Sequence, residues 1–150
     1  MSQTNIAYDY DFYAWSIQNA RLMRQGKLSE IDVENIAEEL ESMAKRDRRE
    51  LISRLTVLLM HLLKWQFQPD KRSRSWELTI DEQRDQITLL LTDSPSLKHQ
   101  LEERIANSYR LALKKAMKET CLPKNSFPTD CPYTLEQIIA DDFYPERGGG

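Results

Sequence analysis

The segment 55–63, LTVLLMHLL, constrains the fold of this chain more than any other part of the sequence. Wound into a helix, it carries apolar side chains on almost every side, and such a helix is stable in water only when other elements surround it. It is also far shorter than the roughly 20 residues that a membrane-spanning helix needs. We therefore expect this segment at the centre of a helical bundle, and we expect no membrane attachment.

Helical periodicity continues on both sides of this segment, and the strict alternation of apolar and polar residues that marks a β-strand is absent from the sequence. A chain of 150 residues is long enough to bury a core without disulfides or metals. The sequence therefore predicts an all-α fold, a single-domain bundle of about five to six helices over residues 1–147. The proline-rich segment 122–133 is predicted to be irregular, and the glycine tail at 148–150 to be disordered.

A second helical tract begins near residues 29–32, and its first half carries an apolar stripe. The stripe predicts one face turned into the core. It is interrupted near residues 45–49, where Asp47 and Arg48 take the apolar positions, and it resumes at Leu51. Either one long helix leaves the core for a turn, or two helices meet there. The residues of the stripe are Val33, Ile36, Ala37, Leu40, Met43 and Ala44.

Turn and capping residues predict the other boundaries. Proline ends helices, glycine caps their C-termini, and Ser or Thr caps their N-termini. Phe127 and Tyr133 predict a segment that crosses the bundle, and residues 143–145 are expected to dock at its end. The predicted boundaries are a first helix over 9–25 ending at Gly26, a stop at Pro69, a loop to residue 75, a helix from Ser94 and Pro95 to about residue 119, and a capping box at Thr134 and Gln137.

Charge and cysteine content describe the expected environment. The formal net charge of -3 argues against a general nucleic-acid binder. The first residues lack the basic start and apolar run of a secretory signal, and Cys121 and Cys131 are expected to be reduced thiols. We therefore expect a cytoplasmic protein.

Most catalytic signatures are missing from the sequence. Four glycines, three of them at the C-terminus, cannot build a phosphate-binding loop or a dinucleotide fingerprint, and no Gly-x-Ser-x-Gly motif occurs. The weak candidates for a metal site are Glu38, Glu41 and His61, but the Glu-x-x-His motif of di-iron bundles is absent. We expect no cofactor, and the chain reads more as a binding protein than as an enzyme.

A basic and aromatic segment is the best candidate binding site. Lys71, Arg72 and Arg74 lie beside the aromatic residues Trp65, Phe67 and Trp76, a combination that proteins use to hold single-stranded nucleic acid. The competing interpretation is a solvated loop whose aromatic rings pack inward while its arginines meet Glu34, Glu38 or the acidic C-terminal segment. The candidate binding residues are His61, Lys64, Trp65, Lys71, Arg72, Arg74 and Trp76.

Acidic and basic residues are also segregated along the chain. Residues 30–41 contain six acidic side chains and no basic one, residues 45–76 contain nine basic and three acidic ones, and residues 130–146 are again acidic. Such segments can pair within the fold, between two copies, or with another molecule.

Six short motifs make this chain resemble the domain-of-unknown-function 29 family: DFYAW at 11–15, IAEELE at 36–41, HLLKW at 61–65, RSRSW at 72–76, DSPSL at 93–97 and DFYP at 142–145. The resemblance covers about residues 8–146. It implies a bacterial, largely cyanobacterial, all-helical protein with no established activity.

Three functions are consistent with these features of the sequence. The first is a non-enzymatic interaction module that binds a protein partner or itself through its acidic and basic surfaces. The second is a nucleic-acid-binding accessory protein that uses the segment Lys71–Trp76. The third and weakest is a metal-dependent hydrolase.

Overall fold

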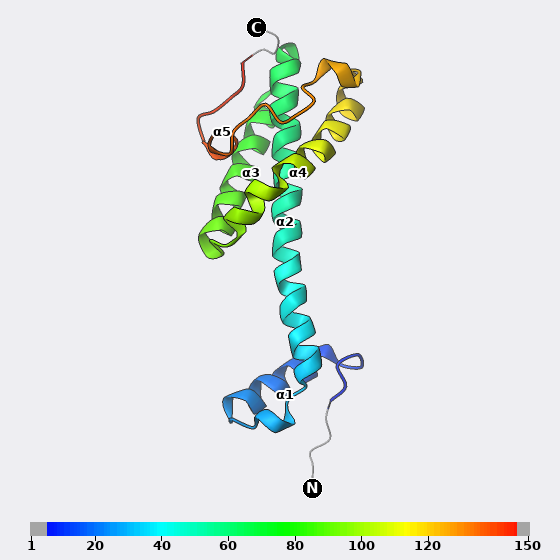
Figure 1. Cartoon of the computed structure of the whole chain (residues 1–150), viewed down its shortest axis with the longest axis vertical. Helices are drawn as coiled ribbons and strands as arrows, with labels where there is room; N and C mark the ends of the chain where they lie inside the picture. Colours follow the sequence, from blue (N-terminus) through cyan, green and yellow to red (C-terminus); the bar gives the residue numbers. More distant parts are fainter. Residues whose placement is uncertain (1–5, 147–150) are drawn as a thin grey trace. The chain divides into compact units, whose positions relative to one another are not determined.

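The computed structural model describes residues 6–146, and all regular secondary structure in that range is helical (Figure 1). The predicted all-α bundle is confirmed, while the predicted glycine tail lies outside the described residues. None of the described helices is long and apolar enough to cross a membrane. The elements are α1 (Phe12–Arg24), η1 (Leu28–Glu30), α2 (Val33–Phe67), η2 (Pro69–Lys71), α3 (Arg74–Asp93), α4 (Leu97–Thr120), η3 (Lys124–Ser126) and α5 (Leu135–Ile139), where η marks a single turn of 3-10 helix.

The chain divides into two compact units, residues 1–45 and residues 46–150. We call their described parts the N-terminal unit (6–45) and the C-terminal unit (46–146). Helix α2 begins in the first unit and ends in the second. The prediction of one domain over residues 1–147 therefore stays a prediction.

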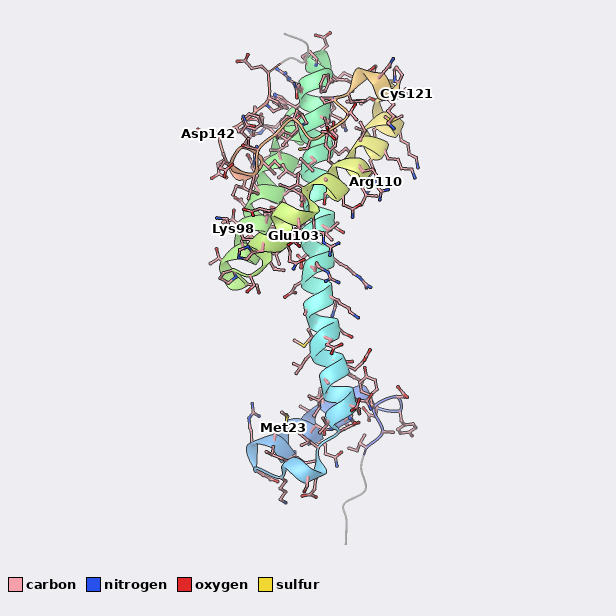
Figure 2. The ribbon with its side chains drawn as sticks, viewed as in Figure 1. Met23, Lys98, Glu103, Arg110, Cys121 and Asp142 are labelled. Atoms are coloured by element: carbon pink, nitrogen blue, oxygen red, sulfur yellow. The ribbon has the colours of Figure 1, made fainter. Side chains whose placement is uncertain are left out.

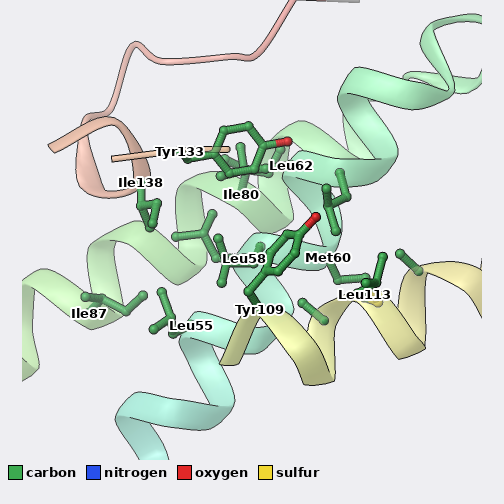
Figure 3. Packing of buried hydrophobic residues seen from close by; sticks show 14 of the residues in the cluster. Leu55, Leu58, Met60, Leu62, Ile80, Ile87, Tyr109, Leu113, Tyr133 and Ile138 are labelled. Carbon is green, nitrogen blue, oxygen red and sulfur yellow. The ribbon is translucent and has the colours of Figure 1, made fainter. Parts of the chain in front are cut away.

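The C-terminal unit holds a continuous hydrophobic core (Figure 3). The second half of α2 supplies its centre, since Leu55, Leu58 and Leu62 are fully buried. Helices α3 and α4 add residues such as Ile80 and Tyr109. The prediction that segment 55–63 is surrounded by other elements is confirmed, because an apolar helix circumference has to be covered on all sides.

The segment after α4 crosses this core as predicted. Phe127 and Tyr133 are both buried, and Phe127 packs edge-to-face on Phe67 with ring centroids 5.4 Å apart. The Tyr133 hydroxyl donates to Gln66 Oε1 at 2.7 Å, and the Tyr109 hydroxyl donates to the Pro128 carbonyl at 2.5 Å. These contacts hold an irregular, proline-rich segment in one place.

In the N-terminal unit, α1 has well-formed caps at both ends. The Asp11 side chain accepts the Ala14 N–H at 3.0 Å, so the helix begins at Phe12 rather than at residue 9. Gly26 has φ +74°, and the Lys27 N–H bonds the Leu22 carbonyl at 2.9 Å. This left-handed glycine cap was predicted and is confirmed.

Polar side chains join α1 to the start of α2. The Trp15 Nε1–H donates to Asp32 Oδ2 at 2.9 Å, and the Asp32 N–H donates to Asn19 Oδ1 at 2.8 Å. The Asp32 carboxylate also accepts from the Asn35 side chain at 2.8 Å. This bond, followed by the Trp15 bond, holds the pKa of Asp32 below its usual value. Trp15, Asn19 and Leu22 are the buried side chains described in this unit.

The predicted inner face of α2 is wrong for the first half of the helix. Residues 33–67 form one helix without a break, but Val33, Leu40 and Met43 are 58, 61 and 53% exposed. An amphipathic stripe indicates that a face is suited to burial, but it does not say which chain covers it. Within the N-terminal unit, no described element covers these three side chains.

The predicted start of α4 is also wrong by two residues. Ser94 ends α3 as its C-cap residue, and α4 begins after the N-cap residue Ser96. The Leu97 N–H bonds the Ser94 carbonyl at 2.9 Å, and the Lys98 N–H bonds the Pro95 carbonyl at 3.1 Å. A tight turn with i to i+3 bonds therefore precedes the α-helical ladder. The predicted stop of α2 before Pro69 and the capping box at Thr134 and Gln137 are confirmed.

Candidate functional site

Trp65 and Arg72, two of the predicted binding residues, contact each other in the C-terminal unit. The Arg72 Nε–H donates to the Trp65 carbonyl at 2.8 Å, and the guanidinium lies over the Trp65 ring at 4.9 Å from its centroid. A cation over an indole face is attracted by the ring electrons. This arginine therefore stabilises the turn after α2 and covers one face of the tryptophan.

Lys64 and Trp76 form a second pair of the same kind. Lys64 Nζ lies 4.6 Å from the Trp76 ring centroid and 3.5 Å from Glu119 Oε2. The lysine is only 8% exposed, so its charge is held by an aromatic ring and one carboxylate. Both candidate tryptophans are thus paired with cations of their own chain.

Tyr144 extends this cluster toward α3. Its ring lies 4.8 Å from that of Trp65, and its hydroxyl donates to Asp81 Oδ1 at 3.1 Å. Burial and the Asp81 bond raise the pKa of Tyr144 to about 12, so the hydroxyl stays protonated at neutral pH. Residues 143–145 were expected to dock on the bundle, and these contacts confirm it.

Arg84 lies on the other side of Tyr144 and is fully buried. Its guanidinium is 5.5 Å from the Tyr144 ring centroid, its Nε–H donates to the Ile138 carbonyl at 2.8 Å, and Nη2 donates to the Gln137 carbonyl at 3.3 Å. It therefore satisfies carbonyls at the C-terminal end of α5, where a cation is favoured. The sequence signalled nothing at this position, because a single arginine among acidic residues reads as solvent-exposed.

His61 stands apart from these pairs. Its Nδ1 lies 2.9 Å from the Val57 carbonyl, which only accepts, so Nδ1 carries the proton. Burial lowers the pKa of His61 below its usual 6.5, and the positive charge of Lys64 lowers it further. The residue is a neutral, half-buried side chain bonded to its own helix.

Lys71 and Arg74 are exposed at η2 and at the first turn of α3. The Ser73 side chain caps α3 by accepting the Trp76 N–H at 3.2 Å. Both Trp65 and Trp76 are half-buried, and Trp65 packs against the hydrophobic core. Arg72, however, contacts Trp65 rather than Glu34, Glu38 or the acidic C-terminal segment.

The three candidate metal ligands, Glu38, Glu41 and His61, belong to no metal-binding cluster among the described residues. Glu38 and Glu41 are exposed on α2 in the N-terminal unit, and His61 belongs to the C-terminal unit. Among residues 6–146, no three His, Cys, Asp or Glu side chains lie close enough to hold a metal ion.

A groove of 730 Å³ runs along α4 in the C-terminal unit. Ile105, Tyr109, Leu113 and Met117 line it, and exposed Arg110, labelled in Figure 2, lies at the same groove. Cys131 faces it from the crossing segment, and burial raises the pKa of this thiol, which therefore stays protonated at neutral pH. The groove is mostly apolar, and its lining also includes charged side chains such as Glu102, Lys114 and Asp130.

The first half of α2 presents a second apolar surface, in the N-terminal unit. We call it the α2 apolar face; its exposed residues are Val33, Ala37, Leu40, Met43 and Ala44. Acidic side chains flank it, among them Glu34 and Glu41. The periodicity that wrongly predicted a buried face was also the signal for this surface.

A family model described as Domain of unknown function DUF29 matches residues 7–144. The chain belongs to this family. Neither a curated protein nor a solved structure matches this chain. In this DUF29 member, the features that bear on function are the two apolar surfaces and the cation–aromatic cluster, which consists of Lys64, Trp65, Arg72, Trp76, Arg84 and Tyr144.

Of the residues that the sequence singled out in this DUF29 chain, the structure brings together Lys64 with Trp76, and Trp65 with Arg72. His61, Lys71 and Arg74 stay outside these pairs. Sequence reasoning missed Tyr144 and Arg84 as partners in the cluster, and it placed the α2 apolar face inside the fold.

Proposed function

We propose that this chain is a non-enzymatic interaction module that binds protein through its N-terminal unit. The observation that carries the proposal is the distribution of exposed apolar side chains. Of the twelve large hydrophobic residues described as exposed, nine lie between Tyr10 and Met43. So many exposed large apolar side chains within one short part of the chain favour a site for another macromolecule over ordinary solvent exposure.

The shape and charge of this surface support a protein as its ligand. Val33, Leu40 and Met43 follow one side of a regular helix, which is the geometry of a helix that packs on another helix. The acidic residues 30–41 would repel nucleic acid and anionic membranes, so a protein that offers apolar and basic side chains fits best.

The test is affinity capture with tagged wild-type protein and with Leu40→Glu, each lysate split into nuclease-treated and untreated halves. We expect proteins that survive nuclease with wild type and are lost with Leu40→Glu. The matched control is Leu89→Glu on α3, because Leu89 is 55% exposed and lies in the C-terminal unit. An identical set of captured proteins for wild type and Leu40→Glu would contradict the proposal.

Nucleic-acid binding through Lys71 and Arg74 stays a second prediction. The exposed side chains of these two residues favour it. However, Arg72 covers one face of Trp65 and Lys64 covers one face of Trp76, which leaves less ring surface on which bases could stack. Binding of this kind would fall steeply with salt and would be lost in Lys71→Ala, Arg74→Ala double variants. Absence of binding to single-stranded RNA or DNA at low ionic strength would remove it.

A further inference from the structure

We infer that the groove along α4 binds a long-chain fatty acid, with its apolar tail on the groove floor and its carboxylate against the lysines near the end of the helix. The site lies in the C-terminal unit, so the inference does not rest on the function proposed for the N-terminal unit. Size is the first argument for a small ligand. At 730 Å³ the groove falls within the range of about 300 to 1,000 Å³ that is usual for small-molecule sites.

The floor of the groove is an elongated apolar row. Four side chains of α4, each four residues after the one before, follow one face of the helix. From the first to the last of them the helix rises by about 18 Å, which suits an extended hydrocarbon chain better than a compact ring system. The four residues are Ile105, Tyr109, Leu113 and Met117.

The polar atoms of the floor are neutral and suit an apolar tail. The Tyr109 hydroxyl already donates to the Pro128 carbonyl at 2.5 Å, and burial raises the pKa of this tyrosine. The Cys131 thiol also stays protonated at neutral pH, because burial raises its pKa. The charges of the site therefore come from the edges of the groove.

A row of cations runs along one edge. Arg110, which Figure 2 labels, Lys114 and Lys118 are again spaced four residues apart on α4. Arg110 and Lys114 line the groove, and Lys118 lines a smaller hollow of 420 Å³ that shares Lys114 and Met117 with it. Lys124 lines the groove from the crossing segment. Lysines from two segments thus meet at the end of the apolar floor.

The acidic residues of the lining lie farther from this end. Glu102 is about four turns of α4 before Lys118. Asp130 lies near the middle of the floor, because its negative charge adds to the effect of burial in raising the pKa of Tyr109. The potential at the lysine end of the groove is therefore positive.

The lysines at this end lack a counter-ion of their own chain. Glu119, the acidic residue next to Lys118, is held by Lys64 at 3.5 Å. Lys114, Lys118 and Lys124 take part in none of the ion pairs found among residues 6–146. A ligand carboxylate would supply the missing charge, and a single long tail behind it would cover the apolar row. A fatty acid combines these two groups.

The first test is isothermal titration calorimetry of the delipidated full-length chain with tetradecanoate. We expect a dissociation constant in the micromolar range. Tetradecylamine has the same tail and a cationic head group, and it should bind at least about tenfold more weakly. Butanoate, whose tail is too short for the floor, should not bind. Absence of tetradecanoate binding at about 100 µM protein, or equal affinity for the amine, would overturn the inference.

A substitution that fills the groove tests the position of the tail. Ala106 is exposed and lines the groove, so Ala106→Trp should lower the affinity for tetradecanoate by about tenfold or more without changing the circular dichroism spectrum. The matched control is Leu111→Trp, at an exposed position of α4 outside the groove lining, which should bind as wild type does. Equal affinities for wild type and Ala106→Trp would place the ligand elsewhere and overturn the inference.

A pair of neighbouring lysines tests the position of the carboxylate. Lys114→Glu should weaken binding by about tenfold, because an attraction becomes a repulsion. Lys115→Glu makes the same change of charge at an exposed residue outside the lining of both hollows, and it should stay within about twofold of wild type. Equal losses in the two variants would overturn the placement of the carboxylate at Lys114.

Discussion

Arg84 brings a full positive charge to a position that solvent does not reach. Burial lowers its pKa from the ordinary value, while the negative charge of nearby Asp81, among others, opposes the shift. An arginine remains protonated in proteins, so its hydrogen bonds to the Ile138 and Gln137 carbonyls have to offset the loss of water. This side chain is therefore a structural link between α3 and α5.

Replacing Arg84 with methionine should lower the free energy of unfolding by about 2 kcal/mol or more, because it leaves buried carbonyls of α5 without a donor. Urea unfolding followed by circular dichroism measures the change. Arg110→Met alters an exposed arginine on α4 and should stay within about 0.5 kcal/mol of wild type. Equal stabilities for the two variants would show that the Arg84 hydrogen bonds contribute nothing net.

His61 should make the stability of the chain depend on pH. Its folded pKa lies below the usual 6.5, so the unfolded chain binds a proton at a pH where the folded chain does not. The stabilising contribution is complete above pH 6.5 and declines as the pH falls below that value. Comparison of urea midpoints at about pH 7.5 and 5.5 should show a larger loss for wild type than for His61→Gln.

The control for this experiment is His99→Gln, which alters the exposed histidine of α4. We expect it to lose stability with pH as wild type does. A His61→Gln variant with the wild-type pH dependence would mean that His61 takes up its proton equally well in the folded and unfolded chain.

At the scale of elements, most boundaries were predictable because local chemistry determines them. Gly26 ends α1 in a left-handed conformation, and Pro69 stops α2, which are properties of single residues. Local chemistry did not show whether Ser94 or Ser96 is the N-cap residue of α4. Either serine is a suitable N-cap residue, and the turn bonds that select Ser96 depend on the packed ends of α3 and α4.

The capping residues of α5 and α4 provide a matched pair of substitutions. The Thr134 side chain accepts the Gln137 N–H at 3.1 Å, whereas the Ser96 side chain makes no capping bond. Thr134→Ala should therefore lower the unfolding free energy by about 1 kcal/mol, and Ser96→Ala should change it by only a few tenths. Chemical denaturation of both variants checks the difference, and a Ser96→Ala effect as large as that of Thr134→Ala would contradict this account of α4.

At the scale of the whole molecule, the buried side chains are unevenly divided between the two units. Nearly all of the described core belongs to residues 51–138, and the N-terminal unit contributes three buried side chains. Segments with few buried contacts unfold locally more often than helices in the core. The stability of the chain is therefore expected to differ from one unit to the other.

Hydrogen exchange measures this difference directly. Amides of α1 should exchange faster than those of residues 55–63, because the N-terminal unit buries few side chains. The slowly exchanging amides of residues 55–63 serve as the internal control. Protection of α1 that is equal to that of residues 55–63 would contradict the uneven division.

The sequence predicted the core better than the surfaces, for a physical reason. An apolar circumference such as that of residues 55–63 admits one solution, complete burial. The stripe from Val33 to Ala44 is compatible with several arrangements, because it could pack on a helix of the same chain or on a helix of another chain. The pairs of Lys64 with Trp76 and Trp65 with Arg72 were also beyond sequence reasoning, since they require the path of the intervening turn.

The crossing segment after α4 has a consequence for how the chain acquires its structure during synthesis. Gln66 and Phe67 emerge from the ribosome long before Tyr133 and Phe127, their partners in the core. Until those later residues have been translated, the apolar surface of α2 beneath them remains uncovered. The core of the C-terminal unit therefore closes only as the last quarter of the polypeptide is released.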